Sequence, residues 1–574
     1  MKKKLVSILL VMGMAVSLLA GCGGSGTDAG DGTESAASDS EGTGNAASAD
    51  SDSADSEGTA AVSFPLMGEN YAYEQELNVI DDNYRNYYEI FVYSFYDSDG
   101  DGIGDLNGVT EKLDYIEEMG FNGIWLMPIM PSSSYHKYDV DDYCAIDEAY
   151  GTMEDFENLV AECHERGIRV VIDFVINHTS SSHEWFVTAC EYLATLEEGE
   201  EPDLEECPYV DYYHFSQTQE SGTYYLVDGT TSWYYEGAFW SGMPDLNVEN
   251  EDLMQELKDI SAFWIEKGVD GFRMDAALHY DESDYTINTS ALNEIYTYCL
   301  SLDEDFYMVS EVWDSESTIA RYYESETPSM FNFLTSSSDG ILVKAAQGTS
   351  SAEKLVSKML DFQETFSAVY ADYIDAPFLT NHDQVRVANN LQSNETNIKM
   401  AAGLLMMMSG SPFVYYGEEI GMKSTGTSDE NKRVAMLWSS DADAEGMTDG
   451  PEDADDFEQT FASVEEQLAD ETSILNYYKR ALRLRNENPE IARGTIAIVE
   501  SLTEDTTAAI TKTYEDSTIA IVYNTSEEAT TVDISGSEIS EMEIRGYLTL
   551  TTDEEITLED GVLTMPGKSI CILK

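Results

Sequence analysis

Short apolar runs alternate with amphipathic stretches over most of the chain. The apolar runs are rich in Val, Ile, Phe, Tyr and Met, which is typical of strands buried on both faces of a parallel sheet. The stretches between them have helical spacing, and three end directly before a glycine, at Gly120, Gly167 and Gly268, a common signal for the end of a helix. The predicted strands are residues 88–96, 123–129, 170–176, 271–279, 306–313, 330–334, 377–380 and 413–416, and the predicted helices are residues 109–119, 153–166, 252–267, 291–302, 352–370, 398–408 and 473–486.

Eight strands that alternate with helices predict the α/β class and a (β/α)8 barrel, also called a TIM barrel. Such barrels carry their functional site at the carboxyl ends of the strands. We assign the barrel to residues 64–178 and 243–490. After residue 490 the pattern changes to short runs rich in Thr, Ile and Val with turn residues between them, which predicts a C-terminal β-sandwich at residues 491–574. This sandwich either packs against the barrel or offers a ligand-binding surface, and packing is the simpler interpretation.

An insertion at residues 179–242 interrupts the alternation after the third strand. It is polar and contains glycine, yet it is dense in aromatic residues. Such rings either form a small core or stack on the apolar C–H faces of a sugar. The aromatic residues are Tyr209, Tyr212, Tyr213, Phe215, Tyr224, Tyr225, Trp233, Tyr234, Tyr235, Phe239 and Trp240.

The N-terminus reads as a targeting segment followed by a tether. Three lysines and a short apolar run make residues 1–22 a signal peptide, and its apolar run is short for a membrane span. Residues 19–22 (LAGC) resemble a bacterial lipobox, which predicts lipidation of Cys22. Residues 23–63 are Gly, Ser, Ala, Thr, Asp and Glu for the most part, without Lys, Arg or aromatic residues, and predict a disordered linker. We therefore expect a protein anchored by lipid on the extracellular face of a bacterial membrane.

The net charge of the chain limits the kinds of molecule that it can bind. The chain has 111 acidic and 29 basic residues, a formal net charge of −82. Such a chain repels nucleic acid and anionic lipid. The composition therefore favours a neutral ligand, such as a sugar, and it leaves protein partners unspecified.

Two carboxylates with different surroundings end two of the predicted strands. Arg273 and Asp275 lie two positions apart in an apolar run and therefore point to the same side of a strand. A nearby cation favours the ionised, nucleophilic form of a carboxylate. Glu311 ends another apolar run, close to Trp313, and apolar surroundings raise the pKa of a carboxyl group, as a general acid requires. Glycosidases use such a pair of carboxyl groups, one as the nucleophile and one as the general acid.

Residues 97–105 (DSDGDGIGD) predict a calcium loop. The carboxylates fall at loop positions 1, 3, 5 and 9, and a glycine occupies position 6, as in oxygen-lined Ca²⁺ sites. Position 12 is Gly108 rather than Glu, so the predicted ion is structural and not that of a sensor. The predicted ligands are Asp97, Asp99, Asp101, the carbonyl of Ile103, and Asp105. A solvated acidic turn is the alternative.

Five segments in order resemble the signature regions of the α-amylase family, glycoside hydrolase family 13. The MPDLN segment resembles the intermediate subgroup of that family, which holds both amylases and neopullulanases, and the N-terminus resembles that of bacterial lipoprotein amylases. Five ordered motifs are far more specific than one. They are residues 173–178 (DFVINH), 243–247 (MPDLN), 271–279 (GFRMDAALH), 310–313 (SEVW) and 378–383 (FLTNHD).

The resemblance assigns roles to individual residues. It implies Asp275 as nucleophile, Glu311 as acid and base, and Asp383 as the third catalytic carboxylate, which binds sugar hydroxyls. It also implies that Asp139 holds the loop of Tyr138, that residues 97–105 bind calcium, and that Asn177 is a ligand of a second calcium ion. The substrate-binding residues that it implies are Tyr138, His178, Arg273, His279 and His382.

The function that follows is a retaining hydrolysis of internal α-1,4 bonds in starch and maltooligosaccharides. Retention predicts a separation of ~5–5.5 Å between the two catalytic carboxyl groups. Neopullulanase, cyclomaltodextrinase or α-1,6-glucosidase activity stays open, and so does glucosyl transfer. In another class, an inactive surface glucan-binding protein is the alternative, although it would have no need for the intact Asp275, Glu311 and Asp383.

Overall fold

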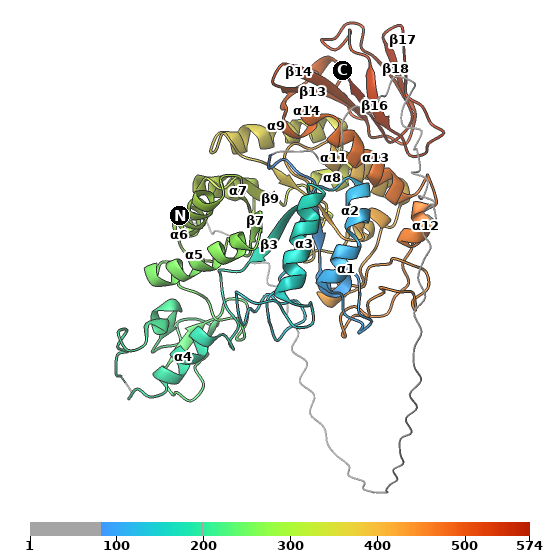
Figure 1. The fold of residues 1–574 in the computed structure, drawn as a ribbon. Coiled ribbons are helices and arrows are strands. Elements are labelled where there is room, and N and C mark those ends of the chain that lie inside the picture. Colours follow the sequence, from blue (N-terminus) through green and yellow to red (C-terminus); the bar gives the residue numbers. More distant parts are fainter. Residues whose placement is uncertain (1–81, 198) are drawn as a thin grey trace, which may run out of the picture. The chain divides into compact units, whose positions relative to one another are not determined.

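The computed structural model describes residues 82–197 and 199–574 (Figure 1). The predicted signal peptide, Cys22 and the linker lie outside the described residues. None of the helices in the described ranges has the length and hydrophobicity that crossing a membrane requires.

Eight parallel strands form the barrel. Their order around the sheet is β10-β9-β8-β7-β3-β2-β1-β11, and a parallel bridge between Phe378 and Phe413 joins its two ends. The (β/α)8 prediction is therefore confirmed. The strands are β1 (Tyr87–Ile90), β2 (Gly123–Leu126), β3 (Arg169–Phe174), β7 (Gly271–Met274), β8 (Tyr307–Ser310), β9 (Ser329–Asn332), β10 (Ala376–Pro377) and β11 (Phe413–Tyr415).

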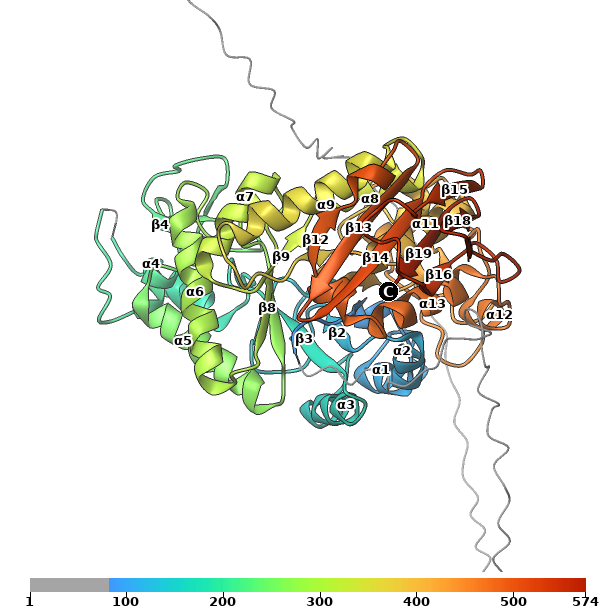
Figure 2. The same ribbon diagram turned by 90° about the horizontal axis from the view of Figure 1, so that it is seen from above.

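Helices surround these strands, as the view from above shows (Figure 2). Local signals set their ends: Thr152 begins α3 with a capping box, and Gly120 ends α2 in the left-handed conformation, which favours glycine. The barrel helices include α1 (Leu106–Glu111), α2 (Leu113–Met119), α3 (Met153–Glu165), α5 (Glu251–Glu266), α6 (Tyr285–Leu302), α7 (Glu316–Tyr322), α8 (Ile341–Ala346), α9 (Ala352–Ser367), α11 (Glu395–Met406) and α13 (Ile474–Asn486).

Several predicted strands are shorter in the structure, the first among them, and one predicted helix is divided. The first strand ends at Ile90 rather than at residue 96, and a 3₁₀ turn at Val92–Ser94 follows it. Val92 and Phe95 remain fully buried after the turn, so the apolar pattern continues where the strand does not. The predicted helix 109–119 is two helices, separated at Lys112.

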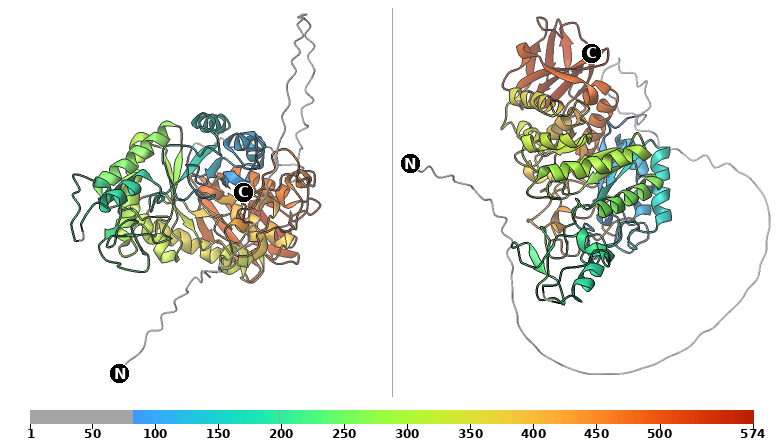
Figure 3. Two further views of the ribbon diagram at one scale, coloured as in Figure 1. Left: turned by 90° about the horizontal axis from the view of Figure 1, so that it is seen from below. Right: turned by 90° about the vertical axis from the view of Figure 1, so that its left-hand side faces the viewer.

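The insertion forms a lobe with its own small sheet (Figure 3). It contains α4 (Glu184–Leu193) and three antiparallel strands, β4 (Phe215–Ser216), β5 (Tyr224–Leu226) and β6 (Tyr234–Glu236). The ring of Phe186 contacts those of Tyr213, Phe215 and Tyr235. Several of the insertion's aromatic residues thus form a core, as one of the two interpretations predicts.

The C-terminal region contains two antiparallel sheets, as predicted. Side chains alternate along the larger sheet: Ile519 and Ile521 join the large core that includes the barrel, whereas Ala520 and Val522 join a second core with the smaller sheet. Both faces of this sheet are therefore buried. The larger sheet contains β12 (Thr495–Ile498), β13 (Thr507–Tyr514), β14 (Ser517–Asn524), β19 (Ser569–Leu573) and β16 (Ile544–Leu548), and the smaller one β15 (Thr530–Asp533), β18 (Val562–Met565) and β17 (Thr557–Glu559).

A buried lysine joins the larger sheet to the barrel. Lys512 of β13 is fully buried, and its Nζ donates to the carbonyls of Met407 and Ile491 and to the hydroxyl of Ser409. Burial and the neighbouring Arg485 lower the pKa of Lys512 well below its usual value. The contact supports the packing interpretation of this region.

Candidate active site

The carboxylates that the sequence analysis selected meet at the carboxyl ends of the strands. In the parallel register, Arg273 of β7 pairs with Val309 of β8 and Met274 pairs with Ser310. The next residues along the two strands are Asp275 and Glu311, so these two residues emerge side by side at the rim. Asp383 lies in the loop after β10.

One guanidinium holds two of the three carboxylates. Arg273 is fully buried, and its Nη1 donates to Oδ1 of Asp275 at 2.6 Å while its Nη2 donates to Oε2 of Glu311 at 2.8 Å. The same Nη1 also bonds Asp173 of β3. Arg273 therefore positions both candidate catalytic groups, with Asp173 behind it.

The backbone after Asp275 contributes a second donor to Glu311. Ala276 adopts a left-handed φ of 48°, a conformation that is costly for a residue with a Cβ. In this conformation its N–H donates to Oε2 of Glu311 at 3.1 Å. Because Oε2 of Glu311 accepts from both Arg273 and Ala276, we assign the proton of the protonated carboxyl group to Oε1.

Burial raises the pKa of Glu311, because the charged form is desolvated and Asp275 lies close by, although Arg273 opposes the shift. The direction agrees with the sequence-based expectation for a general acid. The aromatic neighbour differs: Trp313 stacks on Phe333 at 4.9 Å and is half exposed. Burial of the carboxyl group itself accounts for the shift, without a need for Trp313.

Asp383 lies between two cations. Its Oδ2 is 3.1 Å from Nε2 of His382, and its Oδ1 accepts from Nη2 of Arg433 at 2.8 Å. Burial alone would raise the pKa of Asp383, but His382 and Arg433 outweigh it and hold the pKa well below its usual range. Asp383 is thus an ionised carboxylate over the whole physiological range.

Tyr138 and His382 stack on each other at the same rim. Their ring centroids are 5.4 Å apart, with planes 17° apart, and the hydroxyl of Tyr138 lies 2.8 Å from Nε2 of His382. Asp139 ties the loop of Tyr138, as expected, by accepting from Ser132 and Ser133.

The other two predicted histidines lie on either side of a residue from the insertion. Phe239 contacts the ring of His178 and the ring of His279, each at a centroid distance of 5.4 Å. His178 is buried, which lowers its pKa, and its Nε2 lies 3.2 Å from the carbonyl of Tyr138. All five predicted substrate-binding residues thus belong to one connected group with Asp275, Glu311 and Asp383.

Sequence reasoning missed three members of this group. Asp173 accepts from the indole of Trp125 as well as from Arg273, and burial raises its pKa to about 7. Glu89 of β1 lies against His382, and Arg433 binds Asp383. Asp173 and Glu89 each place a charge within an apolar run, the signal that selected Arg273. Arg433 lies in a long loop without such a signal.

The calcium loop brings together part of its predicted ligand set. Carboxylate oxygens of Asp97, Asp99 and Asp105 lie within 4.8 Å of one another, and hard oxygen donors of this kind suit Ca²⁺. Asp101 is not part of this group; it is exposed and accepts from the N–H of Ile103 instead. The inclusion of Asp101 among the ligands therefore has no support in the structure.

Two further buried oxygens belong to the segments by which the insertion leaves the barrel and returns to it. The backbones of His178 and Asp245 form a bridge, and the N–H of Leu246 donates to the carbonyl of Asn177. The Oδ1 atoms of Asn177 and Asp245 are both buried without a hydrogen-bond partner. Burial raises the pKa of Asp245 to about 7. Buried oxygens without donors fit a cation.

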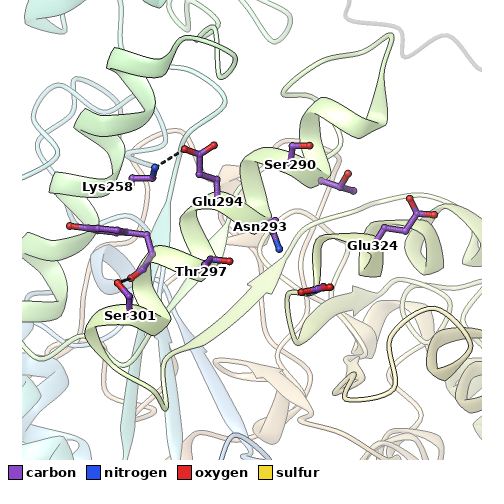
Figure 4. A pocket seen from close by; sticks show the side chains of 10 residues that line it. Lys258, Ser290, Asn293, Glu294, Thr297, Ser301 and Glu324 are labelled. Carbon is purple, nitrogen blue, oxygen red and sulfur yellow. Dashed lines mark hydrogen bonds and ion pairs between the residues drawn. The ribbon is translucent and has the colours of Figure 1, made fainter.

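A hollow of about 820 Å³ lies away from these groups, on the outer helices (Figure 4). Lys258 of α5 and Glu294 of α6 form an ion pair of 2.6 Å within it. Its other lining residues are Thr289, Ser290, Asn293, Thr297, Tyr298, Ser301, Glu324 and Glu326. The hollow contains none of the residues that the sequence analysis selected.

Comparison with known proteins places this geometry in a family. The model for the α-amylase catalytic domain matches residues 89–494. Alpha-amylase 3 of Dictyoglomus thermophilum is 40% identical, over 73% of this chain and 80% of its own. Glucan 1,6-alpha-glucosidase of Streptococcus pneumoniae is 29% identical, over 84% and 97%. The structure of Eubacterium rectale Amy13B has a TM-score of 0.84 and 45% identity, and the match covers 87% of this chain and 97% of the other. The chain is therefore a glycoside hydrolase and belongs to the α-amylase family, glycoside hydrolase family 13.

Proposed function

We propose that this chain is a retaining hydrolase of internal α-1,4-glucosidic bonds in starch and maltooligosaccharides. The observation that carries the proposal is the bridge of Arg273 between Asp275 and Glu311. Arg273 holds the attacking carboxylate of Asp275 and the proton-donating carboxyl group of Glu311 beside each other. This arrangement suits a double displacement, which needs both groups at one bond.

In the first step, Asp275 attacks the anomeric carbon and forms a glycosyl ester. The bond from that carbon to the leaving oxygen breaks, and the leaving oxygen takes the proton from Oε1 of Glu311. In the second step, Glu311 removes a proton from water, and the water oxygen displaces Asp275 with overall retention. The raised pKa of Glu311 supports the acid role, because it keeps the group protonated at higher pH.

Asp383, His382 and Tyr138 would bind the reacting sugar. Asp383 accepts from sugar hydroxyls, and its negative charge stabilises the positive charge that develops in the oxocarbenium-like transition state. Arg433 and His382 fix its orientation through bonds to both of its oxygens. The ring of Tyr138 offers an apolar face to the sugar.

The linkage preference is the open part of this proposal. The relative from Dictyoglomus, named as an amylase, has the higher identity and favours α-1,4 bonds. The streptococcal relative, named as a glucan 1,6-alpha-glucosidase, covers more of the chain and favours α-1,6 bonds as the second candidate.

We further propose two structural calcium sites. Asp97, Asp99 and Asp105 would hold one ion and pin the loop after β1. The orphaned oxygens of Asn177 and Asp245 would hold another and secure the insertion beside the active site. Calcium in either position would supply a fixed positive charge that holds its loop in place.

The location on the cell is also a proposal. Cys22 within the LAGC segment supports a lipid anchor on the outer face of the membrane, and the acidic linker would hold the barrel away from that surface.

The deciding experiment is product analysis after incubation with soluble starch and, separately, with pullulan. Short maltooligosaccharides released from starch in the α configuration, followed by NMR, support the proposal. Maltotriose from pullulan, which requires cleavage of its α-1,6 bonds, would favour the second candidate, whereas panose, which requires cleavage of its α-1,4 bonds, would indicate neopullulanase activity. Binding without any product would favour a glucan-binding protein on an inactive barrel.

A further inference from the structure

A carboxylate of the first strand lies inside the barrel. Tyr87 and Glu89 are two positions apart on β1 and therefore point to the same side of the sheet. The ring of Tyr87 stacks at 5.3 Å on that of Tyr307 from β8, a strand that is not a neighbour of β1, so this side is the interior. Glu89 is buried there. A buried carboxylate is costly unless its charge is compensated, so Glu89 requires a partner.

The partner is His382, from which Glu89 accepts twice. Oε1 of Glu89 lies 2.6 Å from Nδ1 of the ring and accepts from the backbone N–H of the same residue at 3.3 Å. Among the residues that the structure describes, no other cation forms an ion pair with Glu89. Because an ionised carboxylate can only accept, Nδ1 carries a proton. One carboxylate oxygen thus fixes the ring, its backbone and the proton on one nitrogen.

The opposite nitrogen faces two groups that the proposed function assigns to the reacting sugar. Nε2 of His382 lies 3.1 Å from Oδ2 of Asp383 and 2.8 Å from the hydroxyl of Tyr138. The ionised Asp383 can only accept, so Nε2 also carries a proton and the ring is an imidazolium. Burial lowers the pKa of His382, but Asp383 and Glu89 outweigh it and raise the pKa to about 9. A neutral ring with its proton at Nδ1 would turn a lone pair towards Asp383 instead.

The other charged groups around His382 come from three different elements. Asp173 of β3 interacts favourably with the charge of the ring. Arg433 donates to the carbonyl of His382 at 3.3 Å, and Nη1 of Arg273 lies 3.5 Å from the hydroxyl of Tyr138, on which the ring stacks. Both guanidinium groups oppose a further positive charge. The imidazolium therefore depends on the carboxylates around it.

We propose that Glu89 is a positioning residue for catalysis, which keeps a proton on each nitrogen of His382, thereby holds Asp383 in place, and sets the alkaline limit of the reaction. The inference rests on the proposed function, in which Asp383 binds the reacting sugar. When His382 loses its proton at high pH, Nε2 stops donating to Asp383. The side chain of Asp383 then keeps its bond to Arg433 and loses the one that fixes its other oxygen.

The test is the pH dependence of kcat/KM for α-glucosyl fluoride in the wild type and in Glu89→Gln. Fluoride departs without a proton, so the acid role of Glu311 does not set the alkaline limb with this substrate. Glutamine keeps the size and the acceptor oxygen of Glu89 but not its charge. We expect the alkaline limb to move to lower pH by roughly 1–3 units, as the loss of a neighbouring opposite charge implies. On the acid side of the limb, kcat/KM should change little.

Glu419→Gln provides the matched control. Glu419 is fully buried, and its Oε1 accepts from the hydroxyl of Tyr88, which precedes Glu89 on β1 and points to the opposite side of the sheet. This variant removes a buried carboxyl group beside the same strand and should leave the alkaline limb in place. An unshifted limb in Glu89→Gln would overturn the proposal, and so would a loss of kcat/KM that is equal at every pH, because a purely structural role predicts it.

NMR titration of histidine-labelled protein separates this inference from the proposed function. It measures the pKa of His382 without turnover, and His382→Gln identifies the signals. We expect a lower pKa in Glu89→Gln than in the wild type, and an unchanged pKa would overturn the role of Glu89. A pKa below ~6.5 in the wild type would do so without any variant. If the wild type cleaves no substrate, the proposed function fails by itself, and the titration still decides whether Glu89 holds the proton of His382.

Discussion

The Nδ1 atom of His382 lies 2.6 Å from Oε1 of Glu89, although 293 positions separate the two residues in the chain. The opposite nitrogen, Nε2, lies 3.1 Å from Asp383. Burial disfavours a charged imidazole, but Asp383 and Glu89 outweigh it and raise the pKa of His382 to about 9. The barrel thus holds an imidazolium ring between the first strand and the seventh.

The ion pair of His382 with Glu89 predicts that the free energy of unfolding depends on pH. The pKa of His382 in the folded chain, about 9, exceeds the unfolded value of ~6.5. By linkage, this difference in pKa adds about 3 kcal/mol to the free energy of unfolding. The stabilisation is fully present below pH ~6.5 and is lost as the pH rises through 9. Urea unfolding of the wild type and of His382→Gln at several pH values measures it. The difference between the two proteins should shrink with rising pH, and parallel curves would contradict the assignment.

Replacement of Arg273 by lysine should destabilise the fold and reduce activity. An ammonium group cannot bond Asp173, Asp275 and Glu311 in the fork geometry of a guanidinium, and breaking a buried pair costs about 3–5 kcal/mol. Denaturant unfolding gives the change in free energy. Arg166→Lys, at a surface ion pair with Glu162, is the control and should change stability by less than about 1 kcal/mol. A similar small change at Arg273 would remove it from this role.

Glu311→Gln should slow the hydrolysis of maltopentaose by roughly 10²–10⁴-fold. The loss with α-glucosyl fluoride should be smaller, because fluoride departs without a proton. Azide, which needs no general base, should then yield α-glucosyl azide by attack on the ester of Asp275, and NMR identifies its configuration. Glu294→Gln, on the outer face of α6, is the control and should behave as the wild type. Equal losses on both substrates would argue against an acid role for Glu311.

Chelation of calcium should lower the melting temperature. An ion present at 100 times its Kd stabilises the folded chain by about 2.7 kcal/mol. Asp97→Asn and Asp245→Asn should each remove one calcium ion per chain in elemental analysis, whereas Asp101→Asn should keep both, because Asp101 lies outside the cluster. Loss of an ion in Asp101→Asn alone would reverse this ligand assignment.

Cys22→Ser should release the protein from the membrane. The thiol of Cys22 is the acceptor for lipid in a lipobox, and without it the acidic chain has no affinity for an anionic surface. Labelling of cells with a palmitate analogue, followed by fractionation, measures both lipid attachment and location. Cys144→Ser is the control, since Cys144 lies on the barrel loop after β2. Membrane retention of unlabelled Cys22→Ser would indicate another anchor.

The barrel and the position of its site could be predicted because the relevant signals are local. Buried parallel strands are apolar throughout, so the charges of Arg273 and Asp275 stood out within such a run. Their position at the ends of strands then followed from the topology alone.

The partners that cross the barrel could not be predicted in the same way. Arg433 reaches Asp383 from a loop 50 positions away, and Phe239 reaches both histidines from an insertion without regular periodicity. Contacts of this kind depend on loop conformation, which apolar spacing does not encode. The end of the first strand at Ile90 was missed for a related reason, because burial continued after the strand had ended.

The C-terminal sheet is not an exchangeable module. The amine of Lys512 supplies hydrogen bonds to two backbone carbonyls and a hydroxyl at the base of the barrel, and these acceptors would stay behind if the sheet were removed. A recombined chain with a foreign C-terminal domain would need a hydrogen-bond donor at the same buried position. We therefore expect a foreign domain to replace this one only if it places a donor at the position of Lys512, and we expect truncation at residue 494 to give an insoluble barrel rather than a minimal enzyme.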